Sequence, residues 1–247
     1  MNFYQRYLNG ENKLVYDEIL ELRQDACLPE NYAQVEAVLN ETLRRVAVNL
    51  EIIYKELQRL DYLFYTEFVF SSDKPLLKPL SDTGVLLKQL DTIVEPFGYV
   101  PLSLKKFYQI VGSCNFVWNY EVNENNFWKT ADPIQIISLD DLVSYTADED
   151  WKETMLETVE ESETSYLEVS ADYLHKDNIS GGMPYSLEIT KYPSIDGLFL
   201  FEPHNTTFID YLRICFEKCG FSKIFKSDLD NDYKSFFSRV KPQMLKI

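Results

Sequence analysis

The chain has 247 residues, of which 45% are hydrophobic and 15% are aromatic, and it carries a formal net charge of −16. A chain of this length and composition can bury a large core, which excludes a disordered protein. The acidic excess argues against a nucleic-acid-binding protein, because phosphate contacts require clustered Lys and Arg. It favours a protein that docks on a basic partner.

The sequence predicts a cytoplasmic protein that does not enter a membrane. The first residues, MNFYQRYLNGENK, lack the basic and apolar regions of a signal peptide. No apolar run approaches the roughly 20 residues that a membrane-spanning helix needs. The four cysteines follow no metal-binding or redox pattern, although Cys215 and Cys219 are spaced i,i+4. We therefore expect reduced cysteines, no cofactor and no bound metal.

Two helices are predicted at the N-terminus, over 12–27 and 31–62, with Pro29 between them. The second carries apolar residues at spacings of four and three, which form one seam: Leu39, Leu43, Val46, Leu50, Ile53, Leu57 and Leu60. The seam predicts a helical hairpin with the first helix folded back on it in a monomer. A homodimer through the 39–60 seam, or packing of the seam on the main body, is the alternative. The first helix covers about half of the seam, so another part of the chain must bury the rest.

A polar, proline-containing stretch over 63–80 predicts the boundary between two parts. Residues 1–70 would form an N-terminal helical hairpin appendage, and residues 71–247 an α+β domain. The elements expected there are a helix over 82–95, a helix between Pro101 and Gly112, strands over 115–118 and 133–139, one or two helices over 140–165, strands over 166–170, 184–190 and 198–201, a helix starting near Asn205 or Thr206, and a short terminal helix. This order predicts a central antiparallel sheet with packed helices.

The acidic charge is concentrated in residues 140–172, which contain twelve acidic residues and one base, a net charge of −11. The segment could be a solvated face or a face that binds a partner. The candidate contact residues are Asp148, Glu149, Asp150, Glu153, Glu157, Glu160 and Glu161. Trp118 and Trp128 flank the polar loop EVNENN and are further candidates, unless they form the edge of the core.

The stretch Tyr166–Ile189 contains His175, and the other histidine of the chain, His204, follows the next strand. A carboxylate beside an imidazole can act in acid–base catalysis, and two histidines with a carboxylate can hold a metal. Asp and Asn before a turn also bond to nearby backbone, which favours a structural turn that fixes the register of a hairpin. The residues of this possible pocket or turn are Asp172, His175, Asp177, Asn178, Glu202 and His204. The chain has no GxSxG, phosphate-binding loop or HExxH motif.

Three blocks in this order resemble the SUKH superfamily of bacterial immunity-type proteins, which includes a yeast cell-wall-synthesis regulator. They are VPLSLKKFYQIVGSCNF over 100–116, DPIQIISL over 132–139, and ADYLHKDNISGGMPY over 171–185 followed by HNTTFIDYLRICF over 204–216. The resemblance covers about 82–225 and implies an α+β fold. It also implies a non-enzymatic protein that binds and neutralises a cognate toxin domain. The alternative from the residues alone is a small hydrolase or metal-dependent enzyme that uses His175 and His204 with nearby carboxylates.

Overall fold

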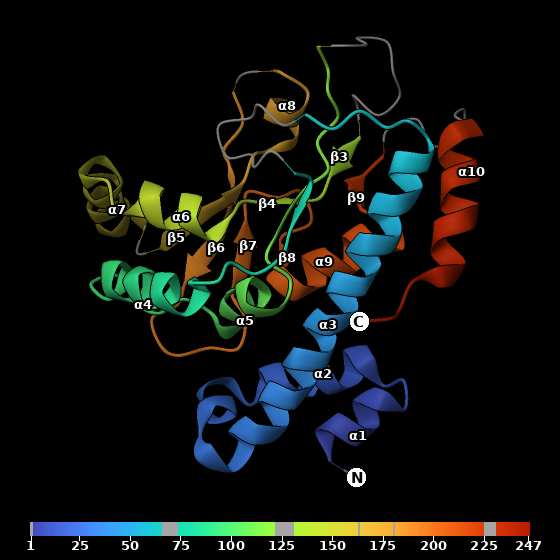
Figure 1. Cartoon of the computed structure of the whole chain (residues 1–247). Helices are drawn as coiled ribbons and strands as arrows, with labels where there is room; N and C mark the ends of the chain where they lie inside the picture. Colours follow the sequence, from blue (N-terminus) through green and yellow to red (C-terminus); the bar gives the residue numbers. More distant parts are fainter. Residues whose placement is uncertain (1, 66–73, 122–130, 163, 180, 225–230) are drawn as a thin grey trace.

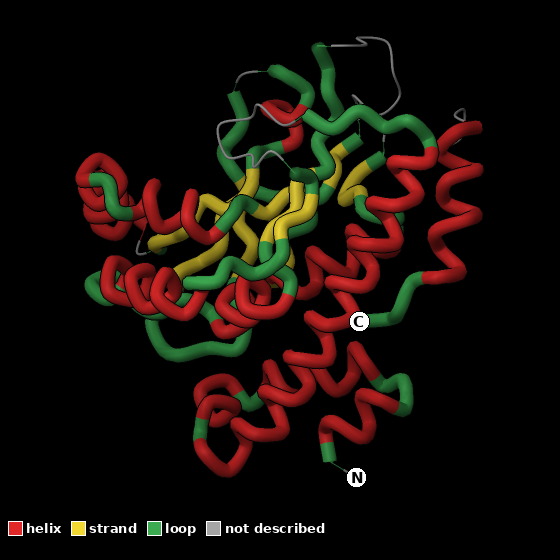
Figure 2. Tube along the Cα trace, viewed as in Figure 1, coloured by secondary structure: helices red, strands yellow, loops and turns green. Residues whose placement is uncertain are grey.

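The computed structural model describes residues 2–65, 74–121, 131–162, 164–179, 181–224 and 231–247. It has an α+β fold, with helices packed around antiparallel strands and a helical region at the N-terminus (Figures 1 and 2). This confirms the fold class predicted from the order of elements. Across the described residues, no helix has both the length and the apolarity required to span a membrane.

The N-terminal region is built on one long helix. The elements are α1 (Phe3–Leu8), α2 (Asn12–Glu21), a 3-10 turn (Arg23–Cys27) and α3 (Pro29–Arg59). Pro29 occupies the first turn of α3, where its missing N–H leaves no intrahelical bond unmade. The N-terminal region is helical as predicted, but α3 is met mainly by α1, which the sequence did not predict, and by the 3-10 turn. The expected helix over 12–27 leaves α-helical geometry after Glu21.

The apolar seam of α3 is buried inside this single chain. Six of its seven residues are at most 1% exposed, and Leu60 is half-buried. Helix α3 packs on α1 and the 3-10 turn, and on α5 and α10 of the body. The seam is thus covered within one chain, as the monomer prediction requires, and the homodimer through the 39–60 seam stays an untested alternative.

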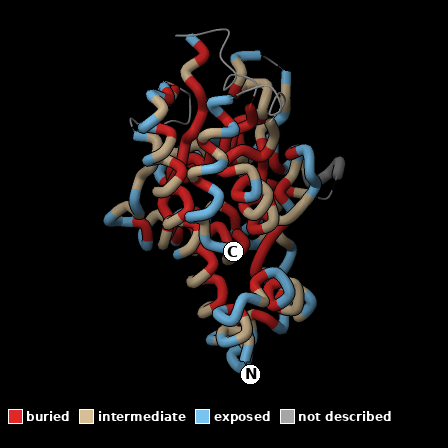
Figure 3. The backbone as a smooth tube through the Cα atoms, turned by 90° about the vertical axis from the view of Figure 1, so that its right-hand side faces the viewer, coloured by how far each residue is buried: buried red, intermediate tan, exposed pale blue. Residues whose placement is uncertain are grey.

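The hydrophobic core is continuous from Tyr7 to Ile247. The burial view shows the buried stripe of α3 running from the N-terminal helices into the body (Figure 3). Ion pairs between Glu36 and Lys106, 2.6 Å, and between Glu56 and Arg239, 2.9 Å, also tie α3 to the body. The division into 1–70 and 71–247 remains a prediction about folding units.

The strands form two adjoining antiparallel sheets and one separate pair. The first sheet has the order β1–β2–β4, the second has the order β5–β6–β7–β8, and β3 pairs with β9. Bonds from Ile137 N to Val169 O and from Ala171 N to Gln135 Oε1, both 2.9 Å, join the β4 and β5 edges. The bounds are β1 Leu76–Leu77, β2 Ser113–Asn115, β3 Asp132–Pro133, β4 Gln135–Ile136, β5 Ser165–Ser170, β6 Tyr185–Ile189, β7 Leu198–Leu200, β8 Thr206–Thr207 and β9 Phe221–Lys223.

Helices surround the sheets. In Figure 1, α4 and α5 lie below the strands, and α6 and α7 lie beside β5. The bounds are α4 Thr83–Val94, α5 Leu102–Ile110, α6 Leu139–Thr146, α7 Glu149–Ser162, α8 Tyr173–Lys176, α9 Phe208–Glu217 and α10 Asn231–Val240, followed by a 3-10 turn over Lys241–Gln243. The sequence predicted these α-helices, with α6 and α7 expected as one or two helices and α10 as a short terminal helix, except α8, a helix of one turn between β5 and β6.

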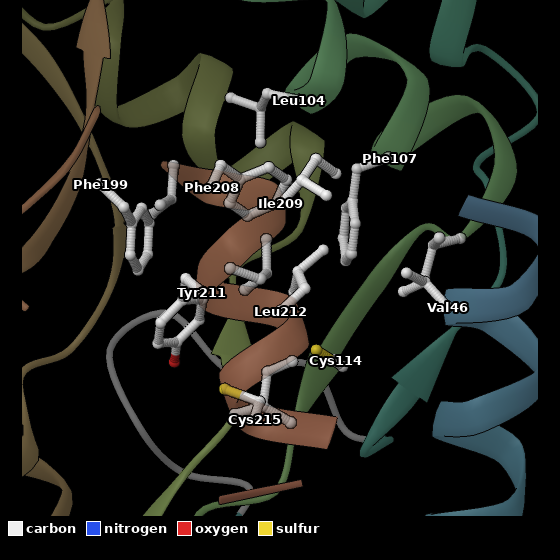
Figure 4. Close-up of a cluster of buried hydrophobic side chains, with 14 of the residues drawn as sticks. Val46, Leu104, Phe107, Cys114, Phe199, Phe208, Ile209, Tyr211, Leu212 and Cys215 are labelled. Atoms are coloured by element: carbon white, nitrogen blue, oxygen red, sulfur yellow. The ribbon is translucent and has the colours of Figure 1, made fainter. Parts of the chain in front are cut away.

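Helix α9 runs through the centre of the core (Figure 4). On one side its rings meet Phe199 of β7, whose centroid is 4.4 Å from that of Tyr211. On the other side Phe208 meets Phe107 of α5 edge-on at 5.6 Å. Such aromatic pairs add about 0.5–1.5 kcal/mol each beyond the area they bury, which favours one fixed seating of α9.

Asp196, in the loop before β7, joins four parts of the chain. Its carboxylate accepts hydrogen bonds from Tyr16 Oη of α2 at 3.2 Å, Ser103 Oγ of α5 at 2.7 Å, Ile209 N of α9 at 3.1 Å and Gly197 N at 3.1 Å. Burial raises the pKa of this carboxyl group. The expectation that Asn205 or Thr206 caps α9 is wrong, because the N-cap residue is Thr207. The Thr207 side chain makes no cap bond.

Candidate functional site

Asp172 stands where β5 ends and the chain turns into α8. Its Oδ1 accepts hydrogen bonds from Leu174 N at 2.8 Å and His175 N at 3.4 Å, so it is the N-cap of this one-turn helix. Its Oδ2 is bonded to His175 Nδ1. The Asp172 side chain is 4% exposed, and that of His175 is 42% exposed. The structure thus brings this predicted pair together, with the carboxylate committed to the backbone and to one ring nitrogen.

The end of α8 is a tight turn. Asn178 adopts φ +59°, and Ile179 N bonds back to Leu174 O at 2.8 Å. Asn tolerates this left-handed conformation better than most residues, which explains its place there. Gly182 lies against the Asp172 carboxylate so closely that a Cβ at this position would overlap it. Asp177 and Asn178 therefore form the C-terminal end of α8. These contacts favour the structural turn over a pocket at this position.

A buried ionic cluster lies beneath this turn, and the sequence reasoning missed it. Lys176 Nζ contacts Asp132 Oδ1 at 2.8 Å and Pro133 O at 3.0 Å, and both charged side chains are 0% exposed. Asp132 Oδ2 accepts from Tyr185 Oη at 2.9 Å and from Ser222 Oγ. The ammonium group also lies 4.7 Å from the centre of the Tyr185 ring. The cluster ties α8 to β3, β6 and β9.

No local pattern in the sequence identifies this cluster. Lys176 and Asp132 are separated by 44 residues, and each is surrounded by ordinary loop residues. The only hint in the sequence is Lys176 itself, a charged residue in a short segment between two predicted strands. Burial, followed by the neighbouring Asp132 carboxylate, raises the pKa of Tyr185, so its hydroxyl stays protonated and acts as a donor.

The second predicted pair, Glu202 and His204, organises the loop between β7 and β8. Glu202 Oε2 accepts from His204 N at 2.9 Å and contacts His204 Nδ1 at 2.8 Å, while Oε1 accepts from Thr206 N at 3.2 Å. The Glu202 side chain is 0% exposed, and that of His204 is 28% exposed. This carboxylate, too, is used to hold backbone.

The two histidines are engaged separately, each by the carboxylate nearest to it in sequence. Among the described residues, no group of three His, Cys, Asp or Glu side chains is placed so that it could hold a metal ion. The geometry thus supplies no shared centre for the alternative that combined His175 with His204.

The predicted acidic contact residues lie on α7 and on the turn before it. Asp148, Glu149, Asp150, Glu153 and Glu157 are all exposed. The opposite side of the helix is anchored by two residues that are at most 3% exposed, Trp151 and Met155. Glu160 and Glu161 continue α7, but their side chains lie outside the described residues.

The first acids of this helix have a local role. Asp148 Oδ1 accepts from Asp150 N at 2.9 Å, and carboxylates in the first turn stabilise the positive end of a helix. Glu149 pairs with Lys152 at 2.6 Å. Glu153 and Glu157, farther along the helix, have neither role in the contacts of the described chain. Next to them Leu156 is 56% exposed, an apolar residue within an acidic surface. We define Asp148, Glu149, Asp150, Glu153, Leu156 and Glu157 as the acidic face.

The tryptophan prediction meets a different outcome at each residue. Trp118 is 5% exposed and packs edge-on against Tyr62 at 5.0 Å, so it belongs to the edge of the core and is not available as a contact residue. Trp128 lies outside the described residues.

A cavity of about 420 Å³ separates the N-terminal helices from the C-terminal tail, and none of the predicted site residues lines it. Its basic residues are largely occupied. Lys241 Nζ bonds to Phe216 O at 3.2 Å and Glu217 O at 3.1 Å, and Arg213 Nε bonds to Ile247 O at 3.0 Å. They hold the tail against the end of α9.

No family model matches the chain, and neither a curated protein nor a solved structure matches it. The resemblance to the SUKH superfamily therefore stays a prediction from the sequence blocks.

Proposed function

We propose that the chain is a non-enzymatic protein-binding module of the immunity type, which binds and neutralises a basic toxin domain in the cytoplasm. The observation that carries this proposal is the acidic face of α7. The SUKH-like blocks supply the functional class, and the acidic face supplies the chemistry of the partner. An apolar centre with charged surroundings is the usual composition of a protein-binding patch.

The charge of this face exceeds what the fold uses. Asp148 and the first-turn acids serve the start of α7, whereas Glu153 and Glu157 point to solvent. In a chain of net charge −16, further exposed carboxylates add repulsion to the folded state. A basic partner would relieve this repulsion on binding. Charge complementarity of this kind accelerates association and makes it sensitive to salt.

The test is co-expression with the product of the adjacent gene, followed by pull-down at low and high salt and by a toxicity assay. We expect capture that weakens with salt, together with protection of the host cell. Absence of capture and of protection for every neighbouring gene product would overturn the proposal.

A pair of triple variants tests the role of the face. Replacing Glu149, Glu153 and Glu157 with Gln removes three charges from the acidic face, and replacing Glu21, Glu30 and Glu95 with Gln removes three exposed charges elsewhere. The first variant should slow association by about tenfold or more, since steering by local charge sets the rate. The second should slow it much less. Equal slowing by both would assign the effect to net charge and not to the acidic face.

A further inference from the structure

The side of the β5–β6–β7 sheet opposite Leu187 is buried at Tyr166, 8% exposed, and at Ser186, 0% exposed, where α6 and α7 pack on β5, and it is exposed at its β7 end. Strand register places Tyr166 opposite Glu188 and Ser186 opposite Leu200, and Leu198 N donates to Glu188 Oε2 at 3.2 Å. Since side chains alternate along a strand, these residues share one face. The residues between them, Leu167, Leu187 and Phe199, are at most 1% exposed and point into the core. We define the outer face as Tyr166, Glu168, Glu188, Leu198, Leu200 and Phe201.

This outer face exposes apolar surface. Leu198 is 49% exposed and Phe201 is 44% exposed. The Phe201 ring meets the Tyr166 ring edge-on at 5.4 Å, although β6 lies between their strands. The Phe201 side chain must therefore fold back across the sheet, over β6, to reach Tyr166.

The backbone of Phe201 is strained in order to present this ring. Its φ is +64°, a left-handed conformation that is unusual for a bulky side chain. Such strain costs of order 1–3 kcal/mol and persists only where the surroundings enforce it. Glu202 enforces it here, because its buried carboxylate fixes the loop that follows. A glycine would relieve the strain, but it would remove the ring from the surface.

Two carboxylates flank the apolar residues. Burial raises the pKa of Glu168, and a hydrogen bond from the Tyr145 side chain opposes that shift. In the part of the chain that the structure describes, no Lys, Arg or His forms an ion pair with Glu168 or Glu188. A cationic side chain beside these carboxylates would gain charge-assisted contacts and the exposed ring of Phe201.

The outer face adjoins the acidic face. Thr158 of α7 is hydrogen-bonded to the Tyr166 side chain, and Glu157 is the residue before it. We infer that the exposed β7 end of the outer face is the apolar centre of the docking surface, on which a basic protein partner lays Arg or Lys side chains against Phe201 and Leu198. The acidic face of α7 is then its charged rim. This inference rests on the proposed function and names where the partner sits.

The experiment uses a defined probe, a fluorescein-labelled 12-residue peptide of alternating Arg and Leu, measured by fluorescence anisotropy. Peptides of alternating Glu and Leu, and of alternating Arg and Ser, separate the contributions of charge and of apolar contact. We expect the wild-type protein to prefer the Arg–Leu peptide to both. Phe201→Gly should weaken its binding at least tenfold while keeping the unfolding midpoint, because glycine accepts the positive φ.

Leu14→Ala is the control, since Leu14 is an exposed apolar residue on α2, 55% exposed against 44% for Phe201. It should change affinity less than twofold. Glu168→Gln should weaken binding and reduce its salt dependence, because it removes charge and keeps an acceptor for Tyr145. Failure of the wild type to prefer the Arg–Leu peptide, or wild-type affinity in Phe201→Gly, would overturn the inference.

The same measurements distinguish the inference from the proposed function. If the α7 triple variant loses peptide binding while Phe201→Gly retains it, the acidic face binds alone and the inference fails while the proposed function stands. If Phe201-dependent peptide binding is found but no neighbouring gene product is captured, the docking surface stands and the immunity role fails.

Discussion

Removing the charge of Lys176 tests a fully buried ion pair. In Lys176→Met the Asp132 carboxylate loses its ammonium partner and keeps two donors, Tyr185 and Ser222. Breaking a buried pair from one side costs about 3–5 kcal/mol, because the remaining charge is left without its counterion. For a chain of this size each kcal/mol lowers the unfolding temperature by about 2–4 °C. We expect a decrease of roughly 6–20 °C.

The double variant Asp132→Asn/Lys176→Met provides the control for lost packing. With both charges removed, the destabilisation should be at least about 1 kcal/mol smaller than the sum of the single effects. Urea unfolding followed by circular dichroism measures all four proteins. Additive effects, or a cost below about 1 kcal/mol for Lys176→Met, would refute the reasoning, since a surface pair behaves that way.

Three further predictions concern glycine, pH and metal. Gly84→Ala in α4, where a Cβ meets nothing within 4 Å, should stabilise the protein by about 0.5–1 kcal/mol. Gly182→Ala should destabilise it by about 1–3 kcal/mol, because its Cβ would overlap Asp172. Thermal unfolding of each variant measures both effects. Burial raises the pKa of Glu168, so ionising this carboxyl group lowers the stability of the fold as pH rises from about 4 through the folded-state pKa. Glu168→Gln should therefore be more stable than wild type at pH 7 but not at pH 4. The reverse order would contradict this assignment. Addition of EDTA should leave the unfolding temperature unchanged, because each histidine is paired with its own carboxylate, and a decrease would point to a resident metal.

The sequence predicted most helices because their apolar periodicity is local. The bounds of α4 and the closing Gly112, at φ +100°, agree with the residues chosen from spacing and backbone freedom. Contacts between distant residues were not predictable in this way. Asp196 caps α9 from 13 residues away, and Lys176 finds Asp132 across 44 residues, so no spacing rule reveals either partner. The one-turn helix α8 is too short to show a period.

The carboxylates of this chain fall into two groups, those with a structural partner in the fold and those without one among the described residues. Asp132 holds a buried ammonium group, and Asp172, Asp196 and Glu202 each accept bonds from backbone N–H groups, so their burial is explained by architecture. Glu153 and Glu157 hold nothing comparable in the described chain and lie beside an exposed leucine. These outer carboxylates and the exposed, positive-φ Phe201 are the features on which the proposed partner would act.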